Sequence, residues 1–302
     1  MSLTAQIRKA VKNRDVFQKI FCYLLCKLGY SDELLCHVEL RNKYLKKLRK
    51  QYQDVLKSFS YDKVSIKDDK SNKVWVCWFQ GMDNAPPIVK KCVQSISEQV
   101  GNENLTIITM DNIEDYVTLP KYIVEKWKKG IISNTHLSDI LRLELLINYG
   151  GLWLDATTFV TGEIPKYIYD NDLFMYRLSD ANDKAIRYNT WLIYATKNNR
   201  VLKMVRDLLY EYWKRENRLK EYFLIHLFIT LVLEKYPDDF NTMFRISDSD
   251  SNILYLNYFN EPYCEETYSN IVKTTSIHKL TYKNLDESKQ GTFYRHIIED
   301  DI

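Results

Sequence analysis

Apolar residues in the first sixty positions recur at helical spacing. The series includes Ile7, Val11 and Phe17, and it continues three and four positions apart as far as residue 25. A second apolar stripe covers residues 42–56, with Lys and Arg on the opposite side. The pattern therefore predicts a mostly helical N-terminal region over residues 1–72, which ends in a polar and charged segment.

The pattern changes after residue 73. An apolar, aromatic and β-branched run at residues 74–79 predicts a buried strand, and Pro86 and Pro87 favour the start of a helix that continues to about residue 100. Residues 105–109 predict a second strand. Strand, helix and strand at this spacing form a βαβ unit, which indicates a parallel sheet. A short helix is expected over residues 119–129.

The most regular pattern lies between residues 133 and 160. Ser133, Asn134 and Thr135 can each cap a helix, and apolar residues follow at helical spacing. Gly150 and Gly151 predict where the helix stops. Residues 152–154 then predict a short strand, which leaves Asp155 at its end.

The rest of the chain mixes strands and long helices. We expect a strand over residues 173–178 and amphipathic helices over 201–213 and 219–236. Short β-like pieces follow in the tail, including residues 253–258 and 271–277. Together these elements predict an α/β fold with a mostly helical N-terminal extension and additional helices.

Composition narrows the class of protein. The chain has 302 residues, of which 45% are apolar and 27% are charged, as is ordinary for a globular protein. No segment reaches the roughly 20 apolar residues that a membrane helix needs. The six cysteines form no cluster at metal-ligand spacing, which favours free thiols and a reducing, cytosolic compartment.

Charge is distributed unevenly along the chain. Residues 1–60 hold 13 Lys or Arg and 5 Asp or Glu, a net charge of +8, whereas the other 242 residues hold 30 and 35, a net charge of −5. Basic helices with an apolar stripe suit an anionic membrane surface, which we expect residues 1–60 to bind. Alternatively, the stripe packs on the rest of the chain. A nucleic-acid partner is disfavoured, because the remaining chain is acidic and contains no recognised motif.

Three polar residues between positions 133 and 160 can carry chemistry. Asp139 and Arg142 lie three positions apart on the predicted helix and so share a face, either as a simple ion pair or as part of a binding site. Asp155 ends the following strand. The carboxyl ends of strands in an open α/β sheet are where ligands usually bind.

His278 is the candidate partner of Asp155 from the other end of the chain. A lone histidine is more often structural, but this one is followed by Lys279 and Lys283. A carboxylate, an imidazole and two diphosphate oxygens suit Mn²⁺ or Mg²⁺, which would neutralise a diphosphate leaving group. We therefore expect Asp155 and His278 to approach one point. The chain contains no P-loop, Rossmann or nucleophile-elbow motif.

The segment from Ser138 to Asp155 resembles the sugar-nucleotide signature of GT-A-fold glycosyltransferases. It is most similar to the capsular polysaccharide synthesis protein family. Further resemblances, in the family's order, lie in residues 74–81 with 84–87, in residues 221–226 and in residues 277–280. The resemblance covers roughly residues 73–285 and implies a GT-A-like nucleotide-sugar-binding domain over residues 73–302.

The resemblance also implies a role for each matched position. Asp155 and His278 would bind the cation, Mn²⁺ or Mg²⁺. Thr157 would be a weak third ligand, because it stands where the wider superfamily has the second aspartate of Asp-x-Asp. Asp155 would also be catalytic. The residues expected to contact the nucleotide, the sugar or the diphosphate are Trp78, Phe79, Gln80, Asp139, Arg142, Lys279 and Lys283.

His226 is the second expected catalytic residue. It interrupts an apolar helix, where an imidazole needs a polar partner. We expect it at the acceptor side of the pocket, with a purely structural hydrogen bond as the alternative.

The function implied by the resemblance is metal-dependent hexosyl transfer. The donor would be a nucleotide-diphosphate sugar, first of all a UDP-sugar. The acceptor would be a saccharide, a lipid-linked one included, in capsular or cell-surface polysaccharide synthesis at the cytoplasmic face of the plasma membrane. The related families imply retention of the anomeric configuration. An inactive GT-A-like binding or scaffold protein is the alternative, which the missing second aspartate favours.

Overall fold

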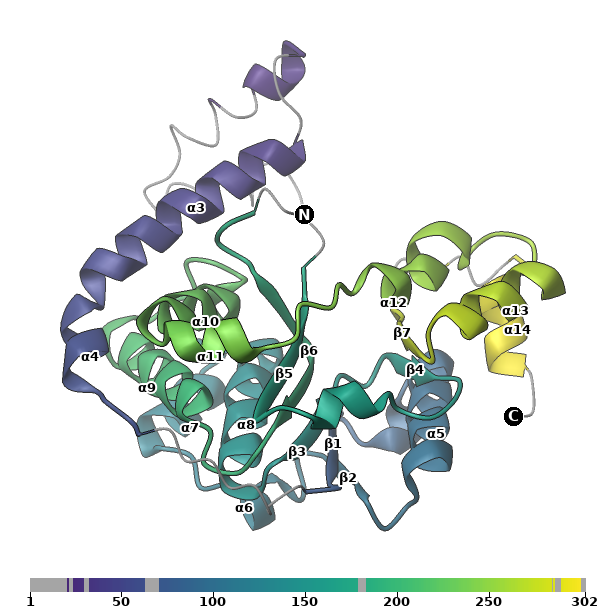
Figure 1. Cartoon of the computed structure of the whole chain (residues 1–302), viewed down its shortest axis with the longest axis horizontal. Coiled ribbons are helices and arrows are strands. Elements are labelled where there is room, and N and C mark those ends of the chain that lie inside the picture. The colour runs from purple at the N-terminus through teal and green to yellow at the C-terminus, as the bar shows by residue number, and fades with distance from the viewer. Residues whose placement is uncertain are drawn as a thin grey trace.

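A five-stranded mixed sheet forms the centre of the protein (Figure 1). The computed structural model describes residues 21, 24–29, 33–62, 71–178, 183–283, 285 and 289–299. Three neighbouring strands run parallel, and the remaining two add on antiparallel to their neighbours. In spatial order the strands are β2 (Leu105–Ile108), β1 (Val74–Cys77), β3 (Gly151–Leu154), β6 (Tyr188–Ala195) and β5 (Leu173–Arg177).

The predicted βαβ unit is confirmed. Helix α5 (Pro87–Val100) connects β1 to β2, and these strands are parallel. Strand β1 also pairs with β3, so residues 74–77 and 151–154 belong to one sheet, as predicted. The sheet as a whole is mixed and not parallel, because β6 enters between β3 and β5 with the opposite direction.

Helix α8 (Asn134–Tyr149) begins and ends where the sequence predicts. The hydroxyl of Ser133 accepts a hydrogen bond from the backbone N–H of His136, and Gly150 ends the helix with a φ of 66°. Gly151 follows with a φ of 102°. A Cβ at this position would collide with the carbonyl of Lys73, the group that accepts the first β1–β3 hydrogen bond. Glycine therefore lets the two strands approach.

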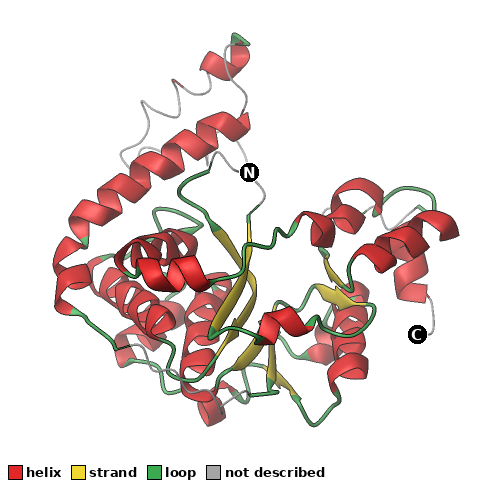
Figure 2. Cartoon of the chain, viewed as in Figure 1, coloured by secondary structure: helices red, strands yellow, loops and turns green. Residues whose placement is uncertain are grey.

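The sheet separates two apolar cores. Side chains alternate along β3, so Trp153 lies in one core, while Leu152 and Leu154 lie in the other. Helices α8, α9 (Arg200–Arg215) and α10 (Leu224–Lys235) supply the first core, and α5 packs in the second. Figure 2 shows helices on both sides of the central strands.

The N-terminal helices share the first core. Helices α3 (Glu33–Gln51) and α4 (Gln53–Ser58) bury Leu45, Leu48 and Tyr52 in the same cluster as α9 and α10. The apolar stripe therefore packs on the rest of the chain. Two ion pairs add to this contact, from Arg41 to Asp183 and from Arg49 to Glu234. Residues 1–20 of the predicted basic region lie outside the described residues.

Several predicted elements differ from the structure. Residues 253–258 are helical and not β-like, because α12 (Ser249–Ile253) continues into a π-helical turn, η3 (Leu254–Tyr258). Residues 271–274 end helix α13 (Glu265–Thr274), and only residue 277 begins a strand, β7 (Ile277–Lys279). Short apolar runs of this kind fit a helix or a strand equally well until tertiary packing decides.

The helix expected over residues 219–236 starts at Leu224, and the sequence pattern missed β6 altogether. The remaining elements are short: η1 (Met82–Asn84), α6 (Ile113–Tyr116), α7 (Lys121–Lys128), β4 (Thr158–Val160), η2 (Lys166–Tyr169), α11 (Pro237–Thr242) and α14 (Phe293–Glu299). Within the described ranges, no helix combines the length and the apolar character that crossing a bilayer requires.

Candidate functional site

Asp155 lies directly after β3, at the carboxyl edge that β3 shares with β1. Its backbone N–H donates to the carbonyl of Trp191 on β6, which holds the turn against the sheet. The indole N–H of Trp153 donates to Asp155 Oδ1 over 3.1 Å. The side chain of Asp155 is still 30% exposed, so the carboxylate is oriented by the protein and open to a ligand.

The buried face of α8 supplies two charges behind this carboxylate. The guanidinium of Arg142 lies 3.2 Å from Asp139 Oδ1 and 3.5 Å from Asp155 Oδ1. It also donates to the carbonyl of Thr190 over 2.6 Å and covers the ring of Trp153. The predicted Asp139–Arg142 pair is therefore formed, and it extends to Asp155.

Lys279 reaches Asp155 from the far end of the sequence. Strand β7 pairs antiparallel with β4, with Lys279 opposite Thr158. The ammonium lies 3.0 Å from Asp155 Oδ2 and 2.7 Å from Thr157 Oγ1. One lysine thus binds both oxygen-bearing residues that the sequence assigns to a metal.

His278 is directed elsewhere. Successive residues of a strand face opposite sides, so the neighbour of Lys279 points away from Asp155. His278 is fully buried, its Nε2 lies 3.1 Å from Thr161 Oγ1, and its ring lies beside Phe159. Burial lowers the pKa of His278 to about 4. The structure therefore places Lys279 beside Asp155, where the sequence led us to expect His278.

The donor set at this edge does not fit a dedicated divalent-cation site. Among the described residues, no group of three or more His, Cys, Asp or Glu side chains could hold a metal ion. The available oxygens, from Asp155 and Thr157, are both bonded to Lys279. Mg²⁺ is usually held by one or two carboxylates together with substrate phosphates and waters, so a cation here would first have to displace Lys279 from Asp155.

The pKa of Asp155 reflects its two cationic neighbours. Burial acts to raise the pKa, but the charges of Lys279 and Arg142 and the hydrogen bonds from Lys279 and Trp153 outweigh it. The net effect holds the pKa of Asp155 below its ordinary value. The carboxylate therefore stays ionised at neutral pH and keeps Lys279 in place.

His226 on α10 is connected to this network through Thr190. Its Nε2 lies 3.2 Å from Thr190 Oγ1, and the carbonyl of the same threonine accepts from Arg142. Burial lowers the pKa of His226 to about 4, although Asp139 and Asp155 act in the opposite direction. The imidazole is therefore neutral at physiological pH. Its buried Nδ1 has no hydrogen-bond partner among the described residues.

His136 was not predicted as a member of the site. It lies in the first turn of α8 and is buried, with Nδ1 3.2 Å from Asp139 Oδ2. Its ring packs edge-on against Trp213 and Tyr222. The spacing of three residues between His136 and Asp139 is the signal that could have identified it.

The residues expected to contact the nucleotide divide into two groups. Trp78 is half-buried just after β1, packs edge-on against Tyr282, and leaves its indole N–H without a partner among the described residues. Lys283 lies over the same tyrosine ring, and Gln80 is exposed. Phe79, by contrast, is buried in the first core, so its ring supports β1 from within.

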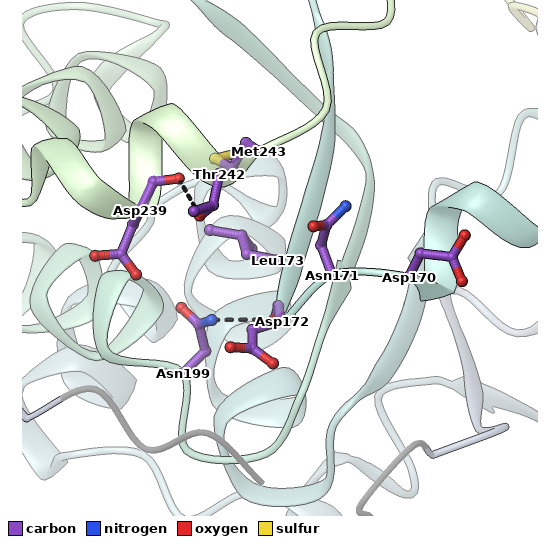
Figure 3. A pocket seen from close by; sticks show the side chains of 8 residues that line it. All are labelled: Asp170, Asn171, Asp172, Leu173, Asn199, Asp239, Thr242 and Met243. Carbon is purple, nitrogen blue, oxygen red and sulfur yellow. Dashed lines mark hydrogen bonds between the residues drawn. The ribbon is translucent and has the colours of Figure 1, made fainter. Parts of the chain in front are cut away.

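A pocket of about 200 Å³ lies at the opposite end of the sheet (Figure 3). Leu173, in its wall, pairs with Ala195 at the end of β6, as does Gly151 at the start of β3, whereas Asp155 follows the other end of β3. The pocket is therefore separate from the edge that holds Asp155. It is lined by Asp170, Asn171, Asp172, Leu173, Asn199, Asp239, Thr242 and Met243.

Comparison with known proteins places the chain among glycosyltransferase-like sequences. It is 29% identical over 164 residues to the O-glycosyltransferase PaGT of Phomopsis amygdali, which covers 48% of this chain and 39% of that protein. It is also 29% identical over 105 residues to the O-glycosyltransferase braB of Annulohypoxylon truncatum, covering 32% of this chain and 24% of that protein. The matched segments thus span less than half the length of these relatives.

Among solved structures, the PaToxG glycosyltransferase matches 67% of this chain and 82% of its own, at 16% identity and a TM-score of 0.36. The profile of one protein family matches residues 31–297, which is most of the sequence and includes β1, α8, Asp155 and Lys279. The chain therefore belongs to the capsular polysaccharide synthesis protein family, as its sequence signature predicts.

Proposed function

We propose that this chain is a glycosyltransferase that moves a sugar from a nucleotide-diphosphate sugar, first of all a UDP-sugar, to a hydroxyl group of a saccharide. Membership of the family and the partial likeness to two O-glycosyltransferases support the reaction class. The observation that carries the proposal is the arrangement at the end of β3. There an ionised, partly exposed Asp155 is held by the buried Arg142 and by a partly exposed Lys279.

A diphosphate leaving group needs positive charge and hydrogen-bond donors around it. Lys279 is partly exposed and can provide both. Trp78 and Tyr282 lie at the same edge of the sheet and offer aromatic surface to a base. Asp139 is buried and bonded to Arg142 and His136, so we assign it to holding these two side chains in place.

We place His226 on the acceptor side of this site. A neutral imidazole can accept a hydrogen bond from an acceptor hydroxyl and orient it, and the lowered pKa of His226 keeps the ring neutral. The structural alternative rests on its hydrogen bond to Thr190. Hexosyl transfer with retention of the anomeric configuration stays a prediction from the related families.

The acceptor that we propose is a saccharide of capsular or cell-surface polysaccharide synthesis, carried on a lipid at the cytoplasmic face of the plasma membrane. The feature that favours a membrane is a basic face on α3, formed by Lys43, Lys46, Lys47 and Lys50, which are all exposed. These lysines lie at helical spacing on one side of the helix.

The cation expected from the sequence, Mn²⁺ or Mg²⁺, is not needed for this proposal. Asp155 and Thr157 would be its ligands, and both are bonded to Lys279, while His278 is bonded to Thr161. Metal dependence therefore stays a prediction, and the experiment of the next subsection addresses it.

The proposal is tested by incubating the full chain with a panel of labelled nucleotide sugars and measuring nucleotide release, with and without added saccharides. We expect release from one donor, faster with a suitable acceptor. Asp155→Asn should lower kcat/KM by about 100-fold or more, since it removes the charge that orients Lys279. Its melting temperature should stay close to that of the unmodified chain. Donor binding without turnover would instead support the inactive scaffold protein.

A further inference from the structure

The oxygens that a divalent cation would use at the end of β3 already have partners. Asp155 Oδ2 and Thr157 Oγ1 are both bonded to the ammonium of Lys279. Asp155 Oδ1 accepts from the indole of Trp153 and faces Arg142. Both oxygens of the carboxylate thus have partners within this chain, although the side chain stays 30% exposed.

The position of Lys279 is determined by backbone pairing. Strands β4 and β7 place Lys279 opposite Thr158, and the N–H of the next residue, Leu280, donates to the carbonyl of Thr157 over 2.8 Å. The backbone of Lys279 is therefore held in place by its pairing with residues 157–158. The contact between Lys279 and Asp155 is thus set by strand pairing.

The two cations at the site differ in what they can still bind. Arg142 is 6% exposed and directs its donors to Asp139, Asp155 and two backbone carbonyls. Lys279 is 21% exposed, and an ammonium has three N–H donors. Two of these are directed to Asp155 and Thr157 among the described residues, so the third is available to a ligand.

A divalent cation and this ammonium would compete for Asp155. A cation bonded to a carboxylate oxygen lies about 2 Å from it. The ammonium lies 3.0 Å from the same oxygen, Asp155 Oδ2. The two positive charges would lie within about 5 Å of each other and repel, so they compete for this carboxylate.

We propose that Lys279 takes the place of a divalent cation in this chain. It stays bonded to Asp155 and Thr157 and donates its third N–H to the diphosphate of the nucleotide sugar. Nucleotide binding then requires neither Mn²⁺ nor Mg²⁺. This inference rests on the proposed function, because it needs a nucleoside diphosphate at the site.

The test measures the binding of UDP, GDP, CDP, ADP and dTDP to the full chain by calorimetry, in excess EDTA and in millimolar MnCl₂. For the nucleotide that binds most tightly, we expect the same Kd within about twofold in both buffers. Lys279→Ala should weaken binding in EDTA by about tenfold or more, the effect of losing one charge-assisted hydrogen bond. MnCl₂ should restore much of that loss, because Asp155 and Thr157 are then free to bind the ion.

Lys273→Ala is the matched control, since it removes an exposed lysine from α13 and should leave the Kd unchanged. Binding by the unmodified chain that is at least about tenfold tighter with MnCl₂ would overturn the inference, whether or not the Lys279 variant folds. So would a Lys279 variant that binds as tightly as the unmodified chain in EDTA. If the unmodified chain binds no nucleotide in either buffer, the proposed function itself fails.

Discussion

Three side chains meet at the carboxylate of Asp155. Trp153 precedes it on β3, Arg142 comes from α8, and Lys279 comes from β7, 124 positions further along the chain. Each of them approaches one oxygen of the carboxylate. At the scale of the residue, the site is defined by the groups that reach Asp155. His278, next to Lys279 in the sequence, contacts Thr161 instead.

His226 is tested by substitution with alanine. If it serves the acceptor, His226→Ala should lower transfer by about 100-fold while hydrolysis of the donor continues. The assay follows both products in one reaction, together with the melting temperature. Equal loss of transfer and hydrolysis with a lower melting temperature would show that the bond to Thr190 is structural.

The burial of His278 predicts a dependence of stability on pH. Its pKa is about 4 in the folded protein and about 6.5 in the unfolded chain, so between these values the unfolded chain binds more protons. The contribution of His278 to the free energy of unfolding is therefore fully present above about pH 6.5 and is lost as the pH falls towards 4. The contribution of His278 to the loss between pH 7 and pH 5 is on the order of 2 kcal/mol.

Urea unfolding at pH 7 and pH 5 measures this effect. His278→Gln cannot be protonated, so its free energy of unfolding should fall less between the two pH values than that of the unmodified chain. If the free energy of unfolding falls by the same amount in the unmodified chain and in the variant, the titration does not belong to His278.

At the scale of the element, the junction between α8 and β3 depends on Gly151. Its φ is 102°, and an added Cβ would meet the carbonyl of Lys73. Gly151→Ala should therefore lower the free energy of unfolding by about 3 kcal/mol or more, since backbone strain and a collision add together. Urea unfolding measures the change.

Gly130→Ala is the control for strain alone. Gly130 also has a positive φ, 69°, but no atom lies within 4 Å of its added Cβ. Its cost should be about 1 kcal/mol. Equal effects of the two substitutions would mean that the contact between β1 and β3 tolerates a side chain.

The sequence pattern predicted the long helix α8 more accurately than it predicted the strand β6. Helix α8 has a cap, a repeating apolar face and two glycines, and each of these signals is local, so its bounds were predicted. Strand β6 follows a segment rich in Ser, Asp and Asn but lacks a glycine at either end, and its burial depends on β3 and β5 on either side. Residues 253–258 became helical because packing in the second core selected one of two compatible periods.

At the scale of the whole molecule, the basic face of α3 is displayed on a helix that is anchored by its other side. Leu45 and Leu48 are buried, while Lys43, Lys46, Lys47 and Lys50 point outward. Membrane binding through this face should therefore be mainly electrostatic. Each lysine near an anionic surface contributes about 1 kcal/mol.

Co-sedimentation with anionic and neutral vesicles tests this expectation. The full chain should bind anionic vesicles at low salt and lose them as the Debye length falls from about 10 Å at 0.1 M to about 3 Å at 1 M salt. Replacing Lys43, Lys46, Lys47 and Lys50 by Glu should lower binding by at least about tenfold. Removing residues 1–60 is unsuitable, because Leu45, Leu48, Tyr52 and Val55 belong to the core.

The matched control replaces four other exposed lysines by Glu, namely Lys121, Lys128, Lys129 and Lys197. It makes the same change in net charge and should leave most of the binding intact. If both quadruple variants lose binding equally, only the total charge matters. If the unmodified chain binds no anionic vesicles at low salt, the basic face has no membrane role.

The sequence alone determined the family, the βαβ unit and the long helix before Asp155, and it singled out Asp139, Arg142 and Asp155, which the structure brings together. These features depend on short-range spacing, which is visible along one stretch of chain. Whether His278 or Lys279 faces Asp155 was decided only in the tertiary structure. The pairing register of β4 and β7 sets it, and shifting that register by one residue would exchange the two side chains.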